Sequence, residues 1–126
     1  MSIDLVITEF CVRFVVQGAI DLAEVKEGYE RAWAHPDFRV GMPYFVDLRD
    51  GTIVQFENRD TRRIASFIRT RLDQHGQVKT AFLCGRSVDH GIARTFEAYA
   101  DIEADLPVRV CRSEEEVLAW LRGEIE

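Results

Sequence analysis

The stretch that decides the fold is Pro43 to Leu72, PYFVDLRDGTIVQFENRDTRRIASFIRTRL. It opens with an apolar run, Tyr44 to Leu48, which is rich in β-forming residues and too short for a helix. It closes with a segment whose apolar residues fall on one side of a helix: Ile64, Phe67, Ile68 and Leu72. A strand that leads through a loop into a helix is half of a βαβ unit. Ligands of open α/β sheets bind outside the carboxyl ends of the strands, so we expect the site between Asp47 and Thr61.

Strand and helix patterns alternate on both sides of this stretch. A hairpin of two strands is predicted before it, followed by a helix that begins with a capping box at Asp21 to Glu24. The predicted strands are at 3–7, 10–17, 44–48, 78–84 and 108–111, with Gly18 ending the second of them. The predicted helices begin at Asp21, at Asn58 or Asp60, at Ser87 or Asp89, and at Ser113, and Gly76 is expected just beyond the end of the second helix. The order ββαβαβαβα predicts one α/β domain, residues 1–126, with a mixed, mostly parallel sheet covered by helices.

Composition excludes several classes of protein. The 126 residues are 47% hydrophobic and carry a formal charge of -6, which argues against general binding to nucleic acid or to anionic membranes. The longest apolar run, Val12 to Ile20, is interrupted by Arg13 and Gln17 and is too short to span a membrane. The first residues lack the basic segment of a signal peptide, so we expect a cytoplasmic protein.

Three cysteines, Cys11, Cys84 and Cys111, each fall inside an apolar, strand-like run. Their odd number and wide spacing are not typical of a disulfide framework or a metal site. We therefore expect buried, reduced thiols, and we predict no metal and no cofactor.

Three segments together resemble the SpoIIAA-like branch of the STAS fold. They are VDLRD at Val46 to Asp50, GIARTFEAYA at Gly91 to Ala100, and SEEEVLAWL at Ser113 to Leu121. The resemblance covers nearly the whole chain and implies a non-enzymatic regulatory or interaction module. Other relatives of this kind are thought to hold a lipid or another apolar ligand between the sheet and the helices. A carrier or sensor of such a ligand is therefore the alternative function.

Anti-sigma-factor antagonists of the STAS family carry a phosphorylatable serine where the helix after the central strand begins, in a motif like Asp-Ser-Ser-Gly. The corresponding segment here, Glu57 to Arg62, has neither the serine pair nor the glycine, and Thr61 is its only hydroxyl. Thr61 could accept a phosphate at the helix N-terminus, among the neighbouring arginines. The interpretation we favour makes it a first-turn residue on a solvated basic face.

Asp47 is unusual because a strand buried on both faces should be apolar throughout. Its carboxylate needs partners. One interpretation is that it accepts backbone N–H groups and holds a loop in shape. The other is that it forms a polar binding site with Arg49, which is two residues on and so on the same face of the strand.

The loop Gly85 to Gly91 brings a hydroxyl, a carboxylate and an imidazole close together in sequence. Neighbours on one loop rarely form a catalytic triad, so we predict that Ser87 or Asp89 caps the next helix and that His90 is a surface imidazole. Parallel strands place this loop at the same sheet edge as Arg49, where a ligand or partner is expected. The candidate binding residues are Asp47, Arg49, Thr61, Arg86, Ser87, Asp89, His90 and Arg94, and a bound anion is expected nearest Arg49, Arg86 or Arg94.

These observations favour a module that binds a regulatory protein or a small apolar ligand, with a homodimer left open and an enzyme as the third choice. A pocket deep enough for an acyl chain would favour the carrier, whereas a flat polar surface from Asp47 to Thr61 would favour protein docking. The core is predicted to bury six aromatic side chains: Trp33, Phe45, Phe67, Phe82, Phe96 and Trp120.

Overall fold

The computed structural model describes residues 3–71, 73, 78–101 and 106–126, and in these residues five strands form a single sheet. In space the strands lie in the order β1-β2-β3-β4-β5; β1 is antiparallel to β2, and the other pairs are parallel. The strands are β1 Ile3–Ile7, β2 Val12–Ala19, β3 Tyr44–Thr52, β4 Thr80–Cys84 and β5 Val108–Cys111; the helices are α1 Leu22–Ala34, α2 Asn58–Arg69, α4 Ser87–Tyr99 and α5 Glu114–Leu121. The predicted α/β class, the mixed sheet and the element order are confirmed.

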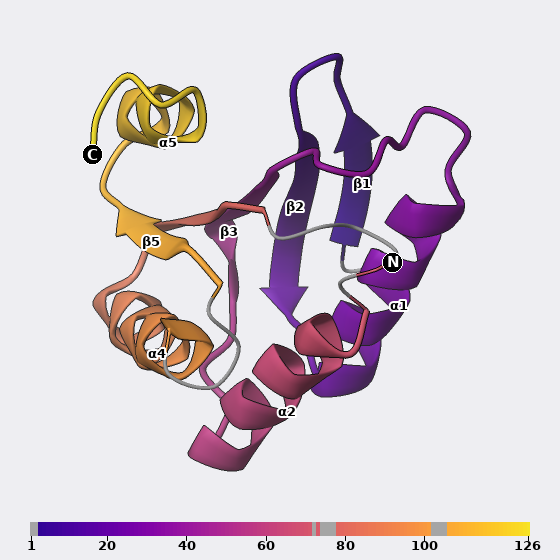
Figure 1. Cartoon of the computed structure of the whole chain (residues 1–126). Coiled ribbons are helices and arrows are strands. Elements are labelled where there is room, and N and C mark those ends of the chain that lie inside the picture. The colour runs from indigo at the N-terminus through magenta and orange to yellow at the C-terminus, as the bar shows by residue number, and fades with distance from the viewer. Residues whose placement is uncertain (1–2, 72, 74–77, 102–105) are drawn as a thin grey trace.

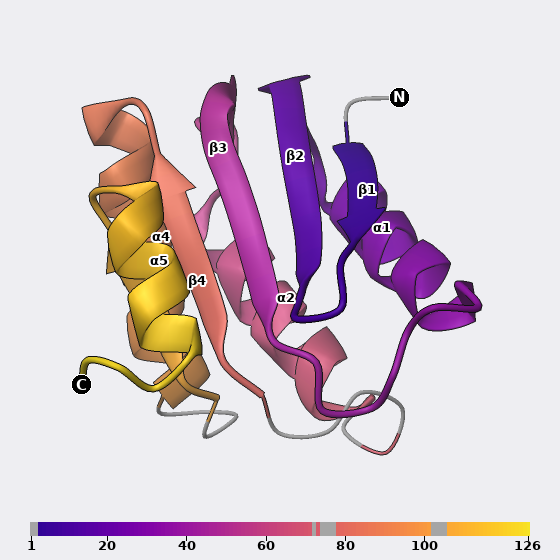
Figure 2. The same ribbon diagram turned by 90° about the horizontal axis from the view of Figure 1, so that it is seen from above.

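The helices cover the two faces of the sheet unequally (Figure 1). Helices α1, α2 and α4 lie on one face, and α5 lies on the other, where it packs on β4 and β5. Figure 2 looks onto that second face and shows β1, β2 and β3 with no described helix across them. The α5 side of these three strands is therefore the least covered part of the sheet.

Local hydrogen bonds define the helix starts. The capping box of α1 is confirmed, since Asp21 Oδ1 accepts from the Glu24 amide at 2.9 Å and Glu24 Oε1 accepts from the Asp21 amide at 3.2 Å. Ser113 caps α5 as predicted by accepting from the amide of Glu116 at 3.1 Å. Gly76, predicted to follow α2, lies outside the described residues.

Two predicted N-caps are wrong. The N-cap of α2 is Glu57, not Asn58 or Asp60, because Asp60 lies one turn into the helix and its Oδ2 accepts from the Glu57 amide at 2.9 Å. The N-cap of α4 is Arg86, so that Ser87 is the first helical residue. In both cases the predicted capping residues lie inside the first turn of the helix.

Strand β3 extends beyond the predicted strand at 44–48 and ends at Thr52. Gly18 pairs with Gly51, and the strand reaches Thr52 after an irregularity in β2 between Val15 and Gln17. A Cβ on Gly51 would lie 2.5 Å from Val16 Cγ1, so only glycine allows the two strands to approach this closely. Gly51 is therefore needed inside the strand.

Alternate residues of the strands supply two apolar cores. The larger core, which contains Phe14, Tyr44 and Leu48, lies under α1, α2 and α4. The smaller core lies under α5: Cys11, Phe45, Ala81, Leu83, Cys111, Val117, Trp120 and Leu121.

Of the six aromatic residues predicted to be buried, Phe45, Phe96 and Trp120 are buried, and Trp33, Phe67 and Phe82 are only half-buried. Trp33 of α1 and Phe67 of α2 stack on each other with their ring centroids 5.7 Å apart.

The three cysteines are unpaired thiols, with Cys11 and Cys111 buried and Cys84 half-buried. Burial raises the pKa of Cys11. Burial likewise raises the pKa of Cys84 to about 12 and that of Cys111 to about 11. The thiols therefore stay protonated near neutral pH, which makes them poor nucleophiles.

Candidate functional site

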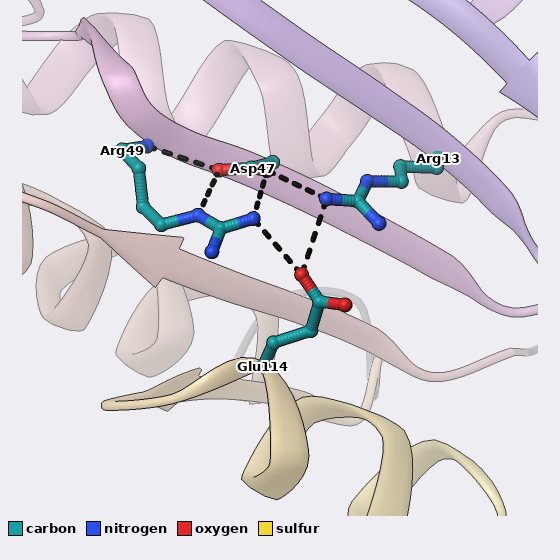
Figure 3. A network of polar contacts seen from close by, with 4 residues as sticks. All are labelled: Arg13, Asp47, Arg49 and Glu114. Atoms are coloured by element: carbon teal, nitrogen blue, oxygen red, sulfur yellow. Dashed lines mark hydrogen bonds and ion pairs between the residues drawn. The ribbon is translucent and has the colours of Figure 1, made fainter.

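Two arginines and two carboxylates form a polar network on the α5 face of the sheet (Figure 3). Asp47 is only 5% exposed. Its Oδ1 accepts from the amide of Arg49 at 3.1 Å and from Nε of the same residue at 3.0 Å. Its Oδ2 accepts from Nη2 of Arg49 at 2.8 Å and from Nη2 of Arg13 at 2.9 Å. Glu114 Oε1 lies between the two guanidinium groups, 2.9 Å from Arg49 and 3.3 Å from Arg13.

Strand register and the start of α5 bring these side chains together. Arg13 is beside Phe45 in the β2–β3 register, and its guanidinium carbon lies 4.5 Å from the centroid of that ring. Arg49 follows Asp47 by two residues, so it emerges on the same face, as the sequence predicted. Glu114 is the first residue of α5. The network thus ties two strands to the helix that covers this face.

Sequence reasoning missed two members of the network, Arg13 and Glu114. Arg13 interrupts an apolar strand in the same way that Asp47 does, and this shared irregularity was the signal that the two could pair. Nothing comparable pointed to Glu114, which is 101 residues away from Arg13 along the chain.

Within the network, Asp47 and Arg49 keep their charges over a wide pH range. Burial raises the pKa of Asp47, but hydrogen bonds from Arg49, followed by those from Arg13, outweigh it and lower the pKa to about 2. Hydrogen bonding to Asp47 raises the pKa of Arg49 above its usual value. Groups that titrate so far from neutrality are suited to binding and orientation, and poorly suited to general acid–base catalysis.

Asp89 is fully buried and has a tertiary role, not the capping role that was predicted. Its Oδ1 accepts from Thr52 Oγ1 at 2.7 Å and from the amide of Ile53 at 2.8 Å. Its Oδ2 has no hydrogen-bond partner among the described residues. Through these hydrogen bonds Asp89 links the end of β3 to the first turn of α4.

Arg86, Ser87 and His90 lie together at the carboxyl ends of β4 and β5. With Arg112 they line an open depression of about 420 Å³. The backbone of this loop touches β3, since a Cβ on Gly85 would lie 2.7 Å from the carbonyl oxygen of Arg49. The predicted meeting of the two strand ends is thus present, although it occurs through backbone contacts.

Arg94 lies apart from the Asp47 network. Its side chain is 62% exposed, and its Nε lies 3.9 Å from Glu97 Oε1 on the same helix. It therefore makes the simple i,i+3 pair that its spacing suggests.

Thr61 is not on a solvated face, so that interpretation is wrong. The residue is 2% exposed, and its Oγ1 donates to the carbonyl oxygen of Asn58 at 2.8 Å. It belongs to α2, which covers the face of the sheet opposite to Asp47. A flat polar surface from Asp47 to Thr61, the feature that would have favoured protein docking there, is therefore absent, because the sheet separates the two side chains. A kinase would also need Thr61 to become exposed.

An apolar cavity of about 60 Å³ lies between the sheet and helices α1, α2 and α4. Phe14 and Val46 line it from the strands, and Gly28, Ile64 and Phe96 line it from the helices. A single water needs roughly 10–15 Å³ measured in this way, so the space suits a compact group of a few atoms. An acyl chain would require the helices to move.

Two glycine substitutions test the packing around the cavity. Gly28 is inside α1, and a Cβ there would meet its nearest atom, Ile3 Cδ1, at 3.6 Å, an ordinary contact. We expect Gly28→Ala to raise the free energy of unfolding by about 1 kcal/mol, because alanine favours the helix and fills part of the cavity. Gly51→Ala should instead lower the free energy of unfolding by about 1–3 kcal/mol, because the added Cβ clashes with Val16. Denaturant titration measures both effects, and a loss of stability in Gly28→Ala would contradict the described packing.

Metal-ion groups and membrane-spanning helices were sought among the described residues. No group of three or more His, Cys, Asp or Glu side chains there is placed to hold a metal ion. None of the helices within residues 3–71, 73, 78–101 and 106–126 has the length and apolar character needed to cross a membrane.

Comparison with protein-family models, with curated proteins and with solved structures found no match to this chain. The fold defines the chain as an α/β protein with a mixed five-stranded sheet. Its resemblance to the SpoIIAA-like branch of the STAS fold remains a prediction from the sequence.

Proposed function

We propose that this chain is a non-enzymatic, STAS-like interaction module that binds a regulatory protein on the α5 side of β1, β2 and β3. We call this surface the open sheet face, formed by Val6, Arg13, Val15, Arg49 and Glu114. The observation that carries the proposal is the polar network of Asp47, which holds two arginines at the border of this uncovered surface.

The open sheet face combines apolar and charged groups in a fixed arrangement. Val6 lies beside Arg13, and Val15 lies beside Asp47 in the strand register. Val6 is 45% exposed, so it adds an accessible apolar side chain to this surface. The side chains of Arg49 and Glu114 are 45% and 40% exposed, so both are accessible to a partner.

Two physical reasons favour a protein as the occupant. Parallel strands are normally covered on both faces, and here α5 leaves part of one face uncovered. The arginines are already ordered by Asp47, so a partner would lose little side-chain entropy in binding them.

Exposed valines provide a matched test. Val6→Asp should weaken the complex with the physiological partner at least about tenfold, because it replaces an apolar contact with a carboxylate that must lose its water on binding. Val88→Asp is the control, since Val88 is similarly exposed, at 41%, but belongs to α4 on the other side of the sheet. Affinity capture from the host with each variant identifies the partner, and titration of the purified pair measures the affinity.

The proposal fails if Val6→Asp and Val88→Asp bind the partner equally well, or if both lose it. Sedimentation equilibrium should be run on the same proteins. A dimer that Val6→Asp dissociates would identify the partner as a second copy of this chain.

A second function, that of a carrier or sensor of an apolar ligand, is favoured by the cavity under α1, α2 and α4. Native mass spectrometry of protein purified from its host tests it. A bound apolar compound whose occupancy falls in Gly28→Ala would support the carrier, because the added methyl group enters the cavity. A spectrum that contains only the mass of the polypeptide would contradict it.

A further inference from the structure

Helix α2 is basic within an acidic protein. Its twelve residues include four arginines, Arg59, Arg62, Arg63 and Arg69, and a single acid, Asp60, whereas the whole chain carries a formal charge of -6. Asp60 lies in the first turn, where its carboxylate accepts from the amide of Glu57. Positive charge is thus concentrated on one helix.

The side of α2 that faces α1 adds aromatic surface to this charge. Phe67 is half-buried, and two cations lie over its ring: Arg71 with its guanidinium carbon at 4.9 Å and Lys26 with its Nζ at 5.6 Å from the centroid. Trp33 stacks on the same residue with an interplanar angle of 17°. Arg63 is four residues before Phe67 and therefore on the same side of the helix. We call Lys26, Trp33, Arg63, Phe67 and Arg71 the Phe67 face.

We propose that the Phe67 face binds an acidic segment of a partner protein that also carries an apolar side chain. Carboxylates of the segment would pair with Arg63, Arg71 and Lys26, and the apolar side chain would pack on Phe67 beside Trp33. Aromatic residues and arginine are the residue types that dominate binding at protein interfaces, and here they occur together. The guanidinium groups also match carboxylates in geometry.

The charge distribution selects a short segment over an extended polyanion. Duplex nucleic acid or an anionic membrane would experience the field of the whole chain, whose net charge is -6. A short acidic segment contacts only the local basic surface. An open depression of about 500 Å³ near the starts of α1 and α2 is lined by Asp21 and Asp60, so the segment should lie toward Arg71 instead.

The Phe67 face is independent of the open sheet face, since the two lie on opposite sides of the sheet. A failure of either proposal leaves the other standing.

The experiment is a display selection of short random peptides against the wild-type protein. The most enriched peptide is then synthesised, and its binding is measured by fluorescence anisotropy at low and high salt.

We expect the enriched peptides to combine Asp or Glu with an aromatic or aliphatic residue, and their affinity to fall as salt rises. The double variant Arg63→Glu, Arg71→Glu should weaken binding about tenfold or more. The control is Arg112→Glu, Arg122→Glu, which reverses two exposed charges next to α5 on the opposite face and should leave the affinity within about twofold. Arg63→Gln, Arg71→Gln is the milder pair if the charge reversal prevents folding.

Three results would overturn the proposal. The first is enrichment of neutral or basic peptides. The second is an equal loss of affinity in the test and control variants, which would indicate only a general effect of charge. The third is displacement of the peptide by duplex DNA or phosphatidylserine vesicles with the same dependence on Arg63 and Arg71, which would assign the surface to extended polyanions.

Discussion

Replacing Asp47 with alanine is expected to lower the free energy of unfolding by about 3 kcal/mol at neutral pH. The carboxylate is 5% exposed and accepts four hydrogen bonds from Arg13 and Arg49. Its removal would leave two guanidinium groups close together and without their shared anion. Their side chains are 28% and 45% exposed, so water would offset part of the loss, and we place the effect at the lower end for a broken buried pair.

The pH dependence of stability provides a second measurement of the same interaction. The pKa of Asp47 falls from 3.8 in an ordinary carboxyl to about 2 in the folded protein. Because the pKa is lower in the folded state, the stabilisation of about 2 kcal/mol is complete above about pH 5 and is lost as the pH falls through about 2. The difference in stability between wild type and Asp47→Ala should therefore shrink between about pH 5 and pH 2.

Glu114→Ala is the matched control for Asp47→Ala. Glu114 contacts the same two arginines, but its side chain is 40% exposed, so the loss should stay below about 1 kcal/mol. Denaturant titrations of the two variants compare them directly. Equal losses, or a loss below about 1 kcal/mol in Asp47→Ala, would mean that the network does not stabilise the sheet as described.

Phe45→Ala should have the other large effect, a loss of about 3–5 kcal/mol in the free energy of unfolding. The ring is 1% exposed and belongs to the smaller core under α5. Truncation would leave a cavity between the sheet and α5 and would remove the surface on which Arg13 lies. The measurement is the midpoint and slope of urea unfolding, with Val6→Ala as the exposed control, for which a change within about 0.5 kcal/mol is expected.

A loss below about 1 kcal/mol in Phe45→Ala would indicate that α5 does not cover this part of the sheet. Because Phe45 and Asp47 both contact Arg13, the double variant should lose less stability than the two single losses combined. Strict additivity would show that Arg13 does not couple them.

Features that depend on neighbours in sequence were predictable. The alternation of apolar residues at strand and helix periods specified the order of elements, because each element must bury its own apolar side. The caps at Asp21 and Ser113 were predictable for the same reason, since donor and acceptor are three residues apart. The common face of Asp47 and Arg49 followed from the period of a strand.

Neighbouring polar residues also caused the errors at the other helix starts. Where several acceptors lie close together, as at Glu57 and Asp60, the cap depends on the backbone angles of the preceding loop. Asp89 was also predicted as a possible cap, but its carboxylate accepts from Thr52 and Ile53, more than thirty residues earlier. A pattern of residue types does not distinguish a carboxylate that caps its own helix from one that bonds a distant loop.

The sequence by itself thus determined the class of fold, the order of its elements and one pair of the polar site. The tertiary structure decided which face each side chain occupies: it placed Thr61 and Asp47 on opposite sides of the sheet and brought Arg13 to Glu114. Periodicity is a local property of the chain, whereas these contacts depend on strand register, on the close approach of β2 and β3 at Gly51, and on the face that each helix covers. Those choices minimise exposed apolar surface over the whole molecule, and no single segment contains the information that fixes them.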